Sequence, residues 1–226
     1  MPVLADPRDA GDGAERPTRP HGRRTRARIL EAAVECLVEL GYANTTTVAV
    51  QAKAGISRGR LLHHFPARDE LLVAAVTHLG EARFGAMIEQ VEANPYQGDV
   101  IDATVDAMWD SMKGPLFIAA TELWVAARTH PELQAVLQPA EQQLWRHLRS
   151  GYQQIFGPYS SHPRFDEVLQ LLVNGMRGFA LTRNFDRSPR PEARHLQSWK
   201  RMAHELLAAD PDIPVPADKT RKKVRH

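Results

Sequence analysis

Apolar residues recur every three or four positions along most of the chain, which is the period of an amphipathic helix. Leu30, Ala33, Leu37 and Leu40 have this spacing, and Gly41 follows them as a residue able to end a helix. Similar spacing continues to about residue 208, and no stretch shows the two-residue alternation of a strand bracketed by turns. The pattern therefore predicts an all-α fold.

Two short helices are predicted next, each bounded by residues that favour turns. The first begins within residues 45–47 and ends at residues 54–55. The second begins after Ser57, whose hydroxyl is a suitable N-cap. It ends near Phe65, because Pro66 cannot continue a helix and restrains the residue before it.

A fourth helix is predicted to begin at Arg68 and to extend to about residues 94–95. Asp69 and Glu70 place negative charge in its first turn, where the helix dipole is positive. Further helical segments are expected at about residues 98–112, 115–130, 132–156, 163–185 and 191–208. The whole pattern amounts to about nine helices.

The chain divides into four predicted parts. Residues 1–21, with four prolines and few large apolar side chains, are expected to form a disordered arm. Residues 22–67 form a three-helix unit, residues 68–208 a larger helical domain, and residues 209–226 a flexible basic tail. No run of eighteen apolar residues appears, so we expect a soluble cytoplasmic protein without a membrane partner.

Charge separates the front of the chain from the rest. The formal net charge is only +2, but residues 22–68 hold eight Lys and Arg against three Glu, whereas residues 69–226 hold 18 basic and 20 acidic residues. This asymmetry indicates that the front faces a polyanion, the alternative being a solvated basic surface. Cys36 is the one cysteine, so an internal disulfide and a multi-cysteine zinc site are excluded.

The two short helices and the turn between them have the form of a helix-turn-helix, whose second helix enters the DNA major groove. Gly55 suits the turn because it tolerates positive φ. Arg58 and Arg60, at the start of the second helix, can reach base edges, where arginine forks onto guanine O6 and N7. Threonine hydroxyls and helix amide ends suit phosphate oxygens.

The run ARILEAAVECLVELGYANTTTVAVQAKAGISRGRLLHHFPARDELL resembles the DNA-binding domain of TetR-type transcriptional regulators, over about residues 23–80. The ordered combination ILEAA, GY, TTT, AG-S-G, HHF and ELL carries the resemblance. The resemblance implies a ligand-responsive repressor that binds a palindromic double-stranded operator as a homodimer. It also implies that residues 68–208 bind the effector and form the dimer.

The resemblance further implies DNA contacts at the positions that match the family motif. These are Thr46, Thr47, Ser57, Arg58, Gly59, Arg60, His64 and Arg68. The threonines match phosphate-facing residues, residues 57–60 match the contacting end of the recognition helix, and the last two match contacts to the DNA backbone. Two positions depart from the family pattern: Leu62 stands where tyrosine is usual, and Gln51 stands where alanine is usual.

Each of these assignments has a plainer alternative. Thr46 could act only as a helix cap, and the two recognition-helix arginines could contact phosphates instead of bases. Arg23, Arg24 and Arg26 could touch the minor groove or phosphates, or belong to an arm with no role. His63 is as compatible with solvent as with DNA.

Aromatic, methionine and arginine side chains between the fourth and eighth helices predict an effector pocket that is partly apolar. The predicted lining residues are Met108, Trp109, Met112, Phe117, Trp124, Arg128, Tyr152, Met176 and Arg177. Arg128, Arg177 or Asn174 would orient a polar group of the effector, and the alternative for the apolar members is plain core. The resemblance implies that effector binding tilts the fourth helix, changes the separation of the recognition helices and weakens DNA binding.

The last two helices are predicted to form an intermolecular four-helix bundle. Gly175 and Gly178 allow close helix approach beside Leu171, Leu172 and Leu181. The alternative is that these residues are buried within one subunit.

Two other functions compete with DNA binding. An enzyme is disfavoured because the sequence has no P-loop, dinucleotide-binding glycine motif or nucleophile elbow. Glu192 and His195 have the spacing of one di-iron ligand pair, but such a site needs a second pair, so we predict no catalytic residue, metal or cofactor. The other alternative is a helical protein whose basic segment binds an acidic protein.

Overall fold

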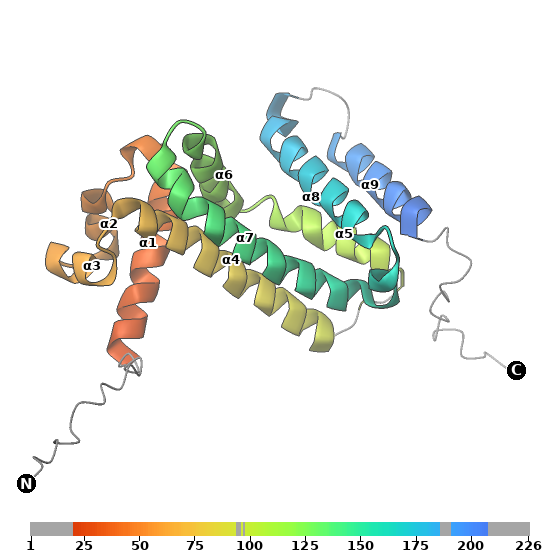
Figure 1. Cartoon of the computed structure of the whole chain (residues 1–226), viewed down its shortest axis with the longest axis horizontal. Coiled ribbons are helices and arrows are strands. Elements are labelled where there is room, and N and C mark those ends of the chain that lie inside the picture. The colour runs from red at the N-terminus through yellow and green to blue at the C-terminus, as the bar shows by residue number, and fades with distance from the viewer. Residues whose placement is uncertain (1–19, 94–95, 97, 186–190, 208–226) are drawn as a thin grey trace, which may run out of the picture.

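The computed structural model describes residues 20–93, 96, 98–185 and 191–207 (Figure 1). The predicted basic tail and the predicted arm lie outside the described residues, except that the first helix already begins at Pro20. Arg23, Arg24 and Arg26 therefore belong to the first turns of a helix instead of an arm.

The described residues contain nine α-helices and two short 3₁₀ segments, with no strand among them. In chain order these are α1 (Pro20–Asn44), α2 (Thr47–Ala54), α3 (Arg58–His64), α4 (Arg68–Ala93), α5 (Val100–Ser111), α6 (Pro115–Ala127), α7 (Pro131–Phe156), η1 (Gly157–Ser161), α8 (Phe165–Thr182), η2 (Arg183–Phe185) and α9 (Pro191–Leu207). The all-α prediction is confirmed. From α2 to α9 the predicted segments differ from these bounds by a few residues at most.

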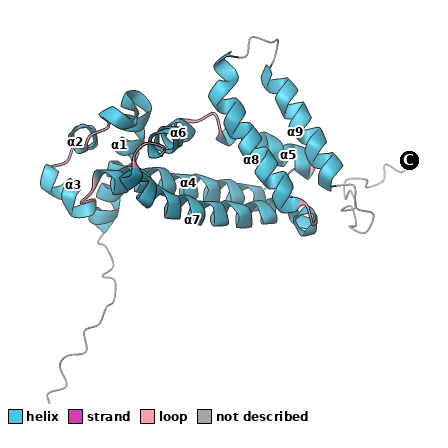
Figure 2. Ribbon diagram, turned by 45° about the horizontal axis from the view of Figure 1, so that its top comes forward, coloured by secondary structure: helices cyan, strands magenta, loops and turns pink. Residues whose placement is uncertain are grey.

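The long helices α4 and α7 lie side by side through the middle of the molecule (Figures 1 and 2). Helices α1, α2 and α3 lie at one end of this pair, while α8 and α9 lie toward the other end with α5 packed against them. By length and composition alone α4 could cross a membrane, but it packs against α1, α6 and α7. Its apolar surface is that of a core helix.

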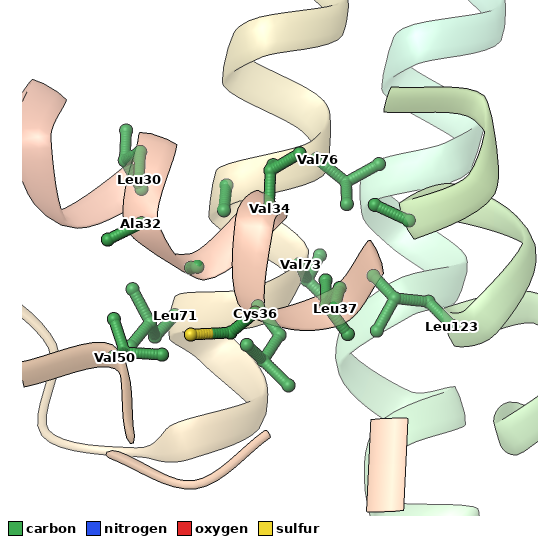
Figure 3. Packing of buried hydrophobic residues seen from close by; sticks show 14 of the residues in the cluster. Leu30, Ala32, Val34, Cys36, Leu37, Val50, Leu71, Val73, Val76 and Leu123 are labelled. Carbon is green, nitrogen blue, oxygen red and sulfur yellow. The ribbon is translucent and has the colours of Figure 1, made fainter. Parts of the chain in front are cut away.

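Two hydrophobic clusters hold these helices together. The first joins α1, α2, α3, α6 and the first half of α4 to the start of α7. Figure 3 shows part of it, with Leu37 of α1 near Val73 of α4 and Leu123 of α6. Cys36 belongs to this cluster, and burial raises the pKa of its thiol, in agreement with the predicted packing role. The second cluster joins α5, the end of α7, α8 and α9.

Gly41 ends the regular path of α1, as the sequence predicted. Its φ of 70° and ψ of 171° lie in a region that is essentially restricted to glycine. The chain then turns toward α2, and Thr45 secures the turn by donating its hydroxyl to the carbonyl oxygen of Gly41 at 2.7 Å. This break sets the direction in which the helix-turn-helix leaves the body of the protein.

Candidate nucleic-acid interface and effector cavity

Both short helices carry the side-chain caps expected from the sequence. The Thr46 hydroxyl accepts a hydrogen bond from the amide of Ala49 at 3.1 Å, and the Ser57 hydroxyl accepts one from the amide of Arg60 at 3.4 Å. Because each hydroxyl oxygen acts as the acceptor, its proton stays available for a phosphate oxygen. Capping and phosphate contact are therefore compatible at these two residues.

The turn between α2 and α3 depends on Gly55. Its φ of 61° and ψ of 44° are left-handed, and its amide is directed at the last carbonyl groups of α2. Added there, a Cβ atom would lie 3.2 Å from Nη2 of Arg28. The glycine thus meets both requirements of the turn: the left-handed backbone and the close approach of α1.

The helix-turn-helix has an apolar inner side and a polar outer side. Val50, Ala54, Leu61 and Phe65 are buried, as the motif requires. The predicted contact residues differ from them in exposure: Thr46, Ser57, Arg58, Gly59 and Arg60 are exposed, and Thr47 is half-buried. The exposed set covers the start of α3, which is the part of a recognition helix that meets base edges.

Arg58 and Arg60 have no ion pair with any other residue that the structure describes. The first turns of α2 and α3 contain no acidic residue that would offset the positive end of the helix dipole. Two free guanidinium groups therefore stand beside an uncompensated helix end. This arrangement favours an anionic partner.

Other basic residues of this region serve packing instead. Lys53 forms ion pairs with Glu39 at 2.7 Å and Glu35 at 3.3 Å. Arg28 donates to the carbonyl oxygen of Ala54 at 2.6 Å, and the guanidinium of Arg26 lies 5.3 Å from the ring centre of Phe65. These contacts fasten α1 to the helix-turn-helix, so the basic excess of the sequence overstates the charge available to DNA.

Arg68 is engaged within the protein, and its predicted contact to the DNA backbone stays a prediction. Its Nε donates to the carbonyl oxygen of Thr45 at 2.6 Å, its Nη1 to Asp69 at 3.0 Å, and its Nη2 to the carbonyl oxygen of Tyr42. The guanidinium carbon also lies 4.2 Å from the ring centre of Tyr42. With its three nitrogens engaged, Arg68 positions the turn before α2 on the start of α4.

His64 lies at the end of α3 and is half-buried. Burial lowers the pKa of its imidazole, and the positive charges of His63, Arg26 and Arg60 lower it further. The ring is thus close to the basic surface, and its predicted contact to the DNA backbone stays a prediction.

Tyr42 is the point at which α1, α4 and α6 meet. Its amide donates to the carboxylate of Glu122 on α6 at 2.9 Å, and its hydroxyl donates to Asp69 on α4 at 3.0 Å. Added to Gly41, a Cβ atom would lie 3.1 Å from the Glu122 carboxylate. The sequence analysis did not identify Glu122, since nothing in a local pattern pairs residues 80 positions apart.

A cavity of about 660 Å³ lies among α4, α5, α6, α7 and α8. Five of the predicted lining residues are in its wall, namely Met112, Phe117, Trp124, Tyr152 and Arg177. Its size falls in the range of pockets that hold drug-sized molecules.

The other four predicted lining residues lie elsewhere. Met108, Trp109 and Met176 are fully buried in the second hydrophobic cluster and do not line the cavity. Arg128 is exposed at the end of α6. Asn174 is exposed on α8 and borders two shallower hollows instead of this cavity.

The sequence analysis missed the contribution of α4 to the cavity. Gly80, Phe84, Met87 and Val91 line it from consecutive turns, with Arg83 beside them. Their spacing of four, three and four positions is a helical stripe, so the signal was present. It is indistinguishable from the stripe of a packed helix until the facing side chains are placed.

The predicted dimer surface is partly exposed. Leu171 and Leu181 retain 45% and 49% of their surface, and Gly175 and Gly178 are exposed beside them. Leu172 instead is buried within the subunit, as expected if this residue packs inside one subunit and not at the dimer interface. Phe185, in η2, is 82% exposed and extends this apolar face.

The two residues of the single Glu-x-x-His pair make separate contacts. Glu192 forms an ion pair with Lys113, while the ring of His195 lies 4.1 Å from that of Phe179. Among the described residues, one group of potential ligands does gather, namely Asp99, Asp102 and His204, in which Nε2 of His204 lies 3.4 Å from Oδ1 of Asp99 and 3.0 Å from Oδ1 of Asp102.

Residues 29–75 match the family model described as "Bacterial regulatory proteins, tetR family". The chain therefore carries a TetR-family segment that contains the helix-turn-helix. Within that match lie α2, the turn at Gly55 and α3, so the predicted resemblance is confirmed on the residues that carried it.

Similarity to known proteins extends beyond the matched segment. An uncharacterized HTH-type transcriptional regulator of Mycobacterium tuberculosis is 27% identical over 169 residues, which cover 74% of this chain and 86% of that protein. A transcriptional regulator from Rhodococcus sp. Rha1 has a similar fold, with a TM-score of 0.62 and 21% identity over 84% of this chain and 99% of that one. The multidrug binding protein EbrR, solved with ethidium, gives a TM-score of 0.59 and 20% identity over 84% and 99%.

Proposed function

We propose that the chain is a TetR-type, ligand-responsive repressor that binds a palindromic operator as a homodimer. The observation that carries the proposal is that α4 belongs to both functional regions. Through Arg68 and Asp69 its first turn holds the junction with the helix-turn-helix, and through Phe84 and Met87 its later turns line the cavity. A ligand in the cavity therefore contacts the helix that positions the DNA-reading element.

On DNA, the exposed start of α3 enters the major groove. Arg58 and Arg60 read base edges, while Thr46 and Ser57 donate their cap hydroxyls to phosphates. His64, at the far end of α3, contacts the DNA backbone. A second subunit places its own α3 in a neighbouring major groove, roughly 34–36 Å away or a multiple of this distance.

The two subunits join through α8 and α9. The exposed apolar face of Leu171, Leu181 and Phe185 supports this arrangement, since a face of this kind is unfavourable in water. Gly175 and Gly178 let the partner helix come close. This geometry fixes the distance between the two recognition helices.

Regulation takes place where α6 meets the end of α1. Phe117 and Trp124 of α6 face the cavity, whereas Glu122 of the same helix binds the amide of Tyr42. An effector that shifts α6 or α4 therefore displaces the residues that orient α2 and α3. It weakens operator binding to the extent that it prefers the conformation unable to bind DNA. The EbrR complex supports a small-molecule effector, because a protein of similar fold is solved with ethidium bound.

The protein works in the cytoplasm and has no enzymatic activity in this proposal. Its family consists of transcriptional regulators, and the one sequence pattern typical of a helical enzyme is dispersed, with Glu192 and His195 in separate contacts. The cavity thus serves recognition without chemistry.

The decisive experiment titrates the purified protein against the DNA upstream of its own gene at several salt concentrations. Specific binding should survive an excess of unrelated DNA, and log K should fall with log salt by about 0.9 per phosphate neutralised. The Arg146→Ala variant, which changes an exposed arginine of α7, is a matched control and should bind the operator DNA with the same affinity as the original protein. Binding that is equal on all sequences, or absent, contradicts the proposal.

A further inference from the structure

The cavity contains features that define the chemical class of its ligand. We propose that the effector is an amphipathic organic carboxylate, whose charged group pairs with Arg177 while its apolar body lies against Trp124, Phe117 and Phe84. This inference rests on the proposed ligand response and specifies the ligand.

Arg177 is a cation inside an otherwise mainly apolar wall. Its guanidinium carbon lies 4.4 Å from the ring centre of Trp124, which joins α8 to α6 across the cavity. Its Nε is buried without a hydrogen-bond partner, and its side chain forms no ion pair with any described residue. The residue as a whole is half-buried, and a cation with a buried, unfilled donor is stabilised when an anion meets it.

Two phenol groups add neutral donors to the same wall. Tyr152 and Tyr96 both line the cavity, and burial raises the pKa of each hydroxyl. The two hydroxyls therefore keep their protons near neutral pH and can donate them. The Tyr152 hydroxyl makes no hydrogen bond to a described residue, so it adds a second unfilled donor to that of Arg177.

The acidic groups of the wall do not satisfy these donors. Asp110 is paired with Lys113 at 2.9 Å and is exposed. Burial lowers the pKa of the Arg177 guanidinium, and the negative charge of Glu141 opposes this shift, but Glu141 lies outside ion-pair distance of Arg177. Since Arg83 also lines the cavity, a bound cation would face two arginines against one available carboxylate.

The shape of the donor group and the rest of the wall favour a carboxylate among organic anions. A guanidinium presents two parallel N–H groups that match the two oxygens of a carboxylate. The remaining wall is largely apolar, with Met87, Leu144 and Leu148 among its members.

The test compares ligands that share an apolar body and differ only in the polar group. Naphthylacetate, naphthylacetamide and naphthylethylamine form one series, and phenylbutyrate with its amide and amine forms another. Isothermal titration should show that each carboxylate binds at least about tenfold more tightly than its amide or amine, the scale of one charge-assisted contact. The carboxylate should also release the protein from its operator DNA.

Variants identify the residue responsible. Arg177→Met and Arg177→Gln should remove the preference for the carboxylate while the amide still binds, which shows that the cavity is intact. Arg128→Gln, which removes an exposed arginine outside the cavity, is the matched control and should keep the preference. Glu141→Gln should leave carboxylate binding unchanged or make it tighter.

Three outcomes overturn the inference. The first is that the amine binds best and loses its affinity in Glu141→Gln, which would identify a cationic effector. The second is equal affinity within each series, and the third is no binding by any member although the operator is bound specifically. All three leave the proposed DNA-binding function standing, whereas failure to bind the operator DNA counts against that function separately.

Discussion

The two regions of this regulator treat the positive ends of their helices differently. Helices α1, α2 and α3 have no acidic residue in the first turn. Among the six remaining helices, all except α6 have at least one. Acidic side chains thus offset the helix dipoles of most helices from α4 to α9. The dipoles of α1, α2 and α3 are not offset in this way, so an anionic partner can interact with their positive ends.

The same contrast applies to unpaired arginines. Arg58 and Arg60 are free and exposed, so they can be satisfied by an extended polyanion that approaches from solvent. Arg177 is unpaired among the described residues and half-buried, with its Nε fully buried, so a small molecule in the cavity can reach it but a DNA duplex cannot enter there. Burial, more than charge, therefore decides which anion each region can bind.

The largest expected effect comes from removing the free charge of the DNA-binding region. The double substitution Arg58→Ala with Arg60→Ala should weaken specific operator binding by about a hundredfold or more, since each bidentate base contact provides about 1–3 kcal/mol. Binding to unrelated DNA should weaken much less. Fluorescence anisotropy with specific and unrelated duplexes measures both, and an equal loss on the two would assign these residues to phosphates.

A substitution at the break in α1 tests how strongly the two regions are joined. Gly41→Ala places a Cβ atom 3.1 Å from the Glu122 carboxylate in a backbone conformation reserved for glycine. It should lower the free energy of unfolding by about 1–3 kcal/mol. Gly85→Ala, in α4 where an added Cβ meets nothing within 4 Å, is the matched control and should be neutral or stabilising. Urea denaturation that shows equal stability for both variants would contradict the role of Gly41.

Glu122 provides a sharper test of the same junction. Glu122→Ala leaves the Tyr42 amide without its acceptor, so the free energy of unfolding should fall by about 1–2 kcal/mol. Glu122→Gln keeps an acceptor and should lose less. In thermal unfolding and ligand-release assays, the alanine variant should also respond less to the effector. An unchanged response would indicate that α4 alone couples the cavity to the helix-turn-helix.

The smallest expected effect is a dependence of DNA affinity on pH through His64. In the free protein its pKa lies below the usual value, and nearby phosphates would raise it, so binding takes up a proton. Affinity should therefore increase as pH falls from 7.5 to 6, by about two- to fivefold. His64→Gln should remove that part of the dependence. A dependence that persists in the variant would have to come from other groups, such as His63.

Several features of the fold followed directly from local sequence. The threonine and serine caps, the left-handed Gly55 and the stop imposed by Pro66 act within one turn of the chain, so the helix-turn-helix was predictable residue by residue. Arg68 was not, because its partners Tyr42 and Thr45 lie 26 and 23 positions earlier and meet it only after α1 folds back on α4.

The cavity shows the same division more clearly. Residue type and helical period identified an apolar face on each of α5, α6, α7 and α8, and five of nine predicted lining residues were placed correctly. Trp109 has the same chemistry as Trp124, yet Phe179 and Trp199 pack against its ring and close the space around it. Periodicity states that a side chain is directed inward, but not whether its neighbours fill the volume it faces.

The sequence by itself thus determined the helices, their caps, the reading element and the division of charge, because these depend on the chemistry of residues a few positions apart. Only the tertiary structure decided which basic groups remain free, where Glu122 joins the two regions, and where the packed helices leave a cavity with Arg177 in its wall. These properties depend on how helices that are distant in sequence pack against one another, and the local sequence pattern is compatible with many packing arrangements.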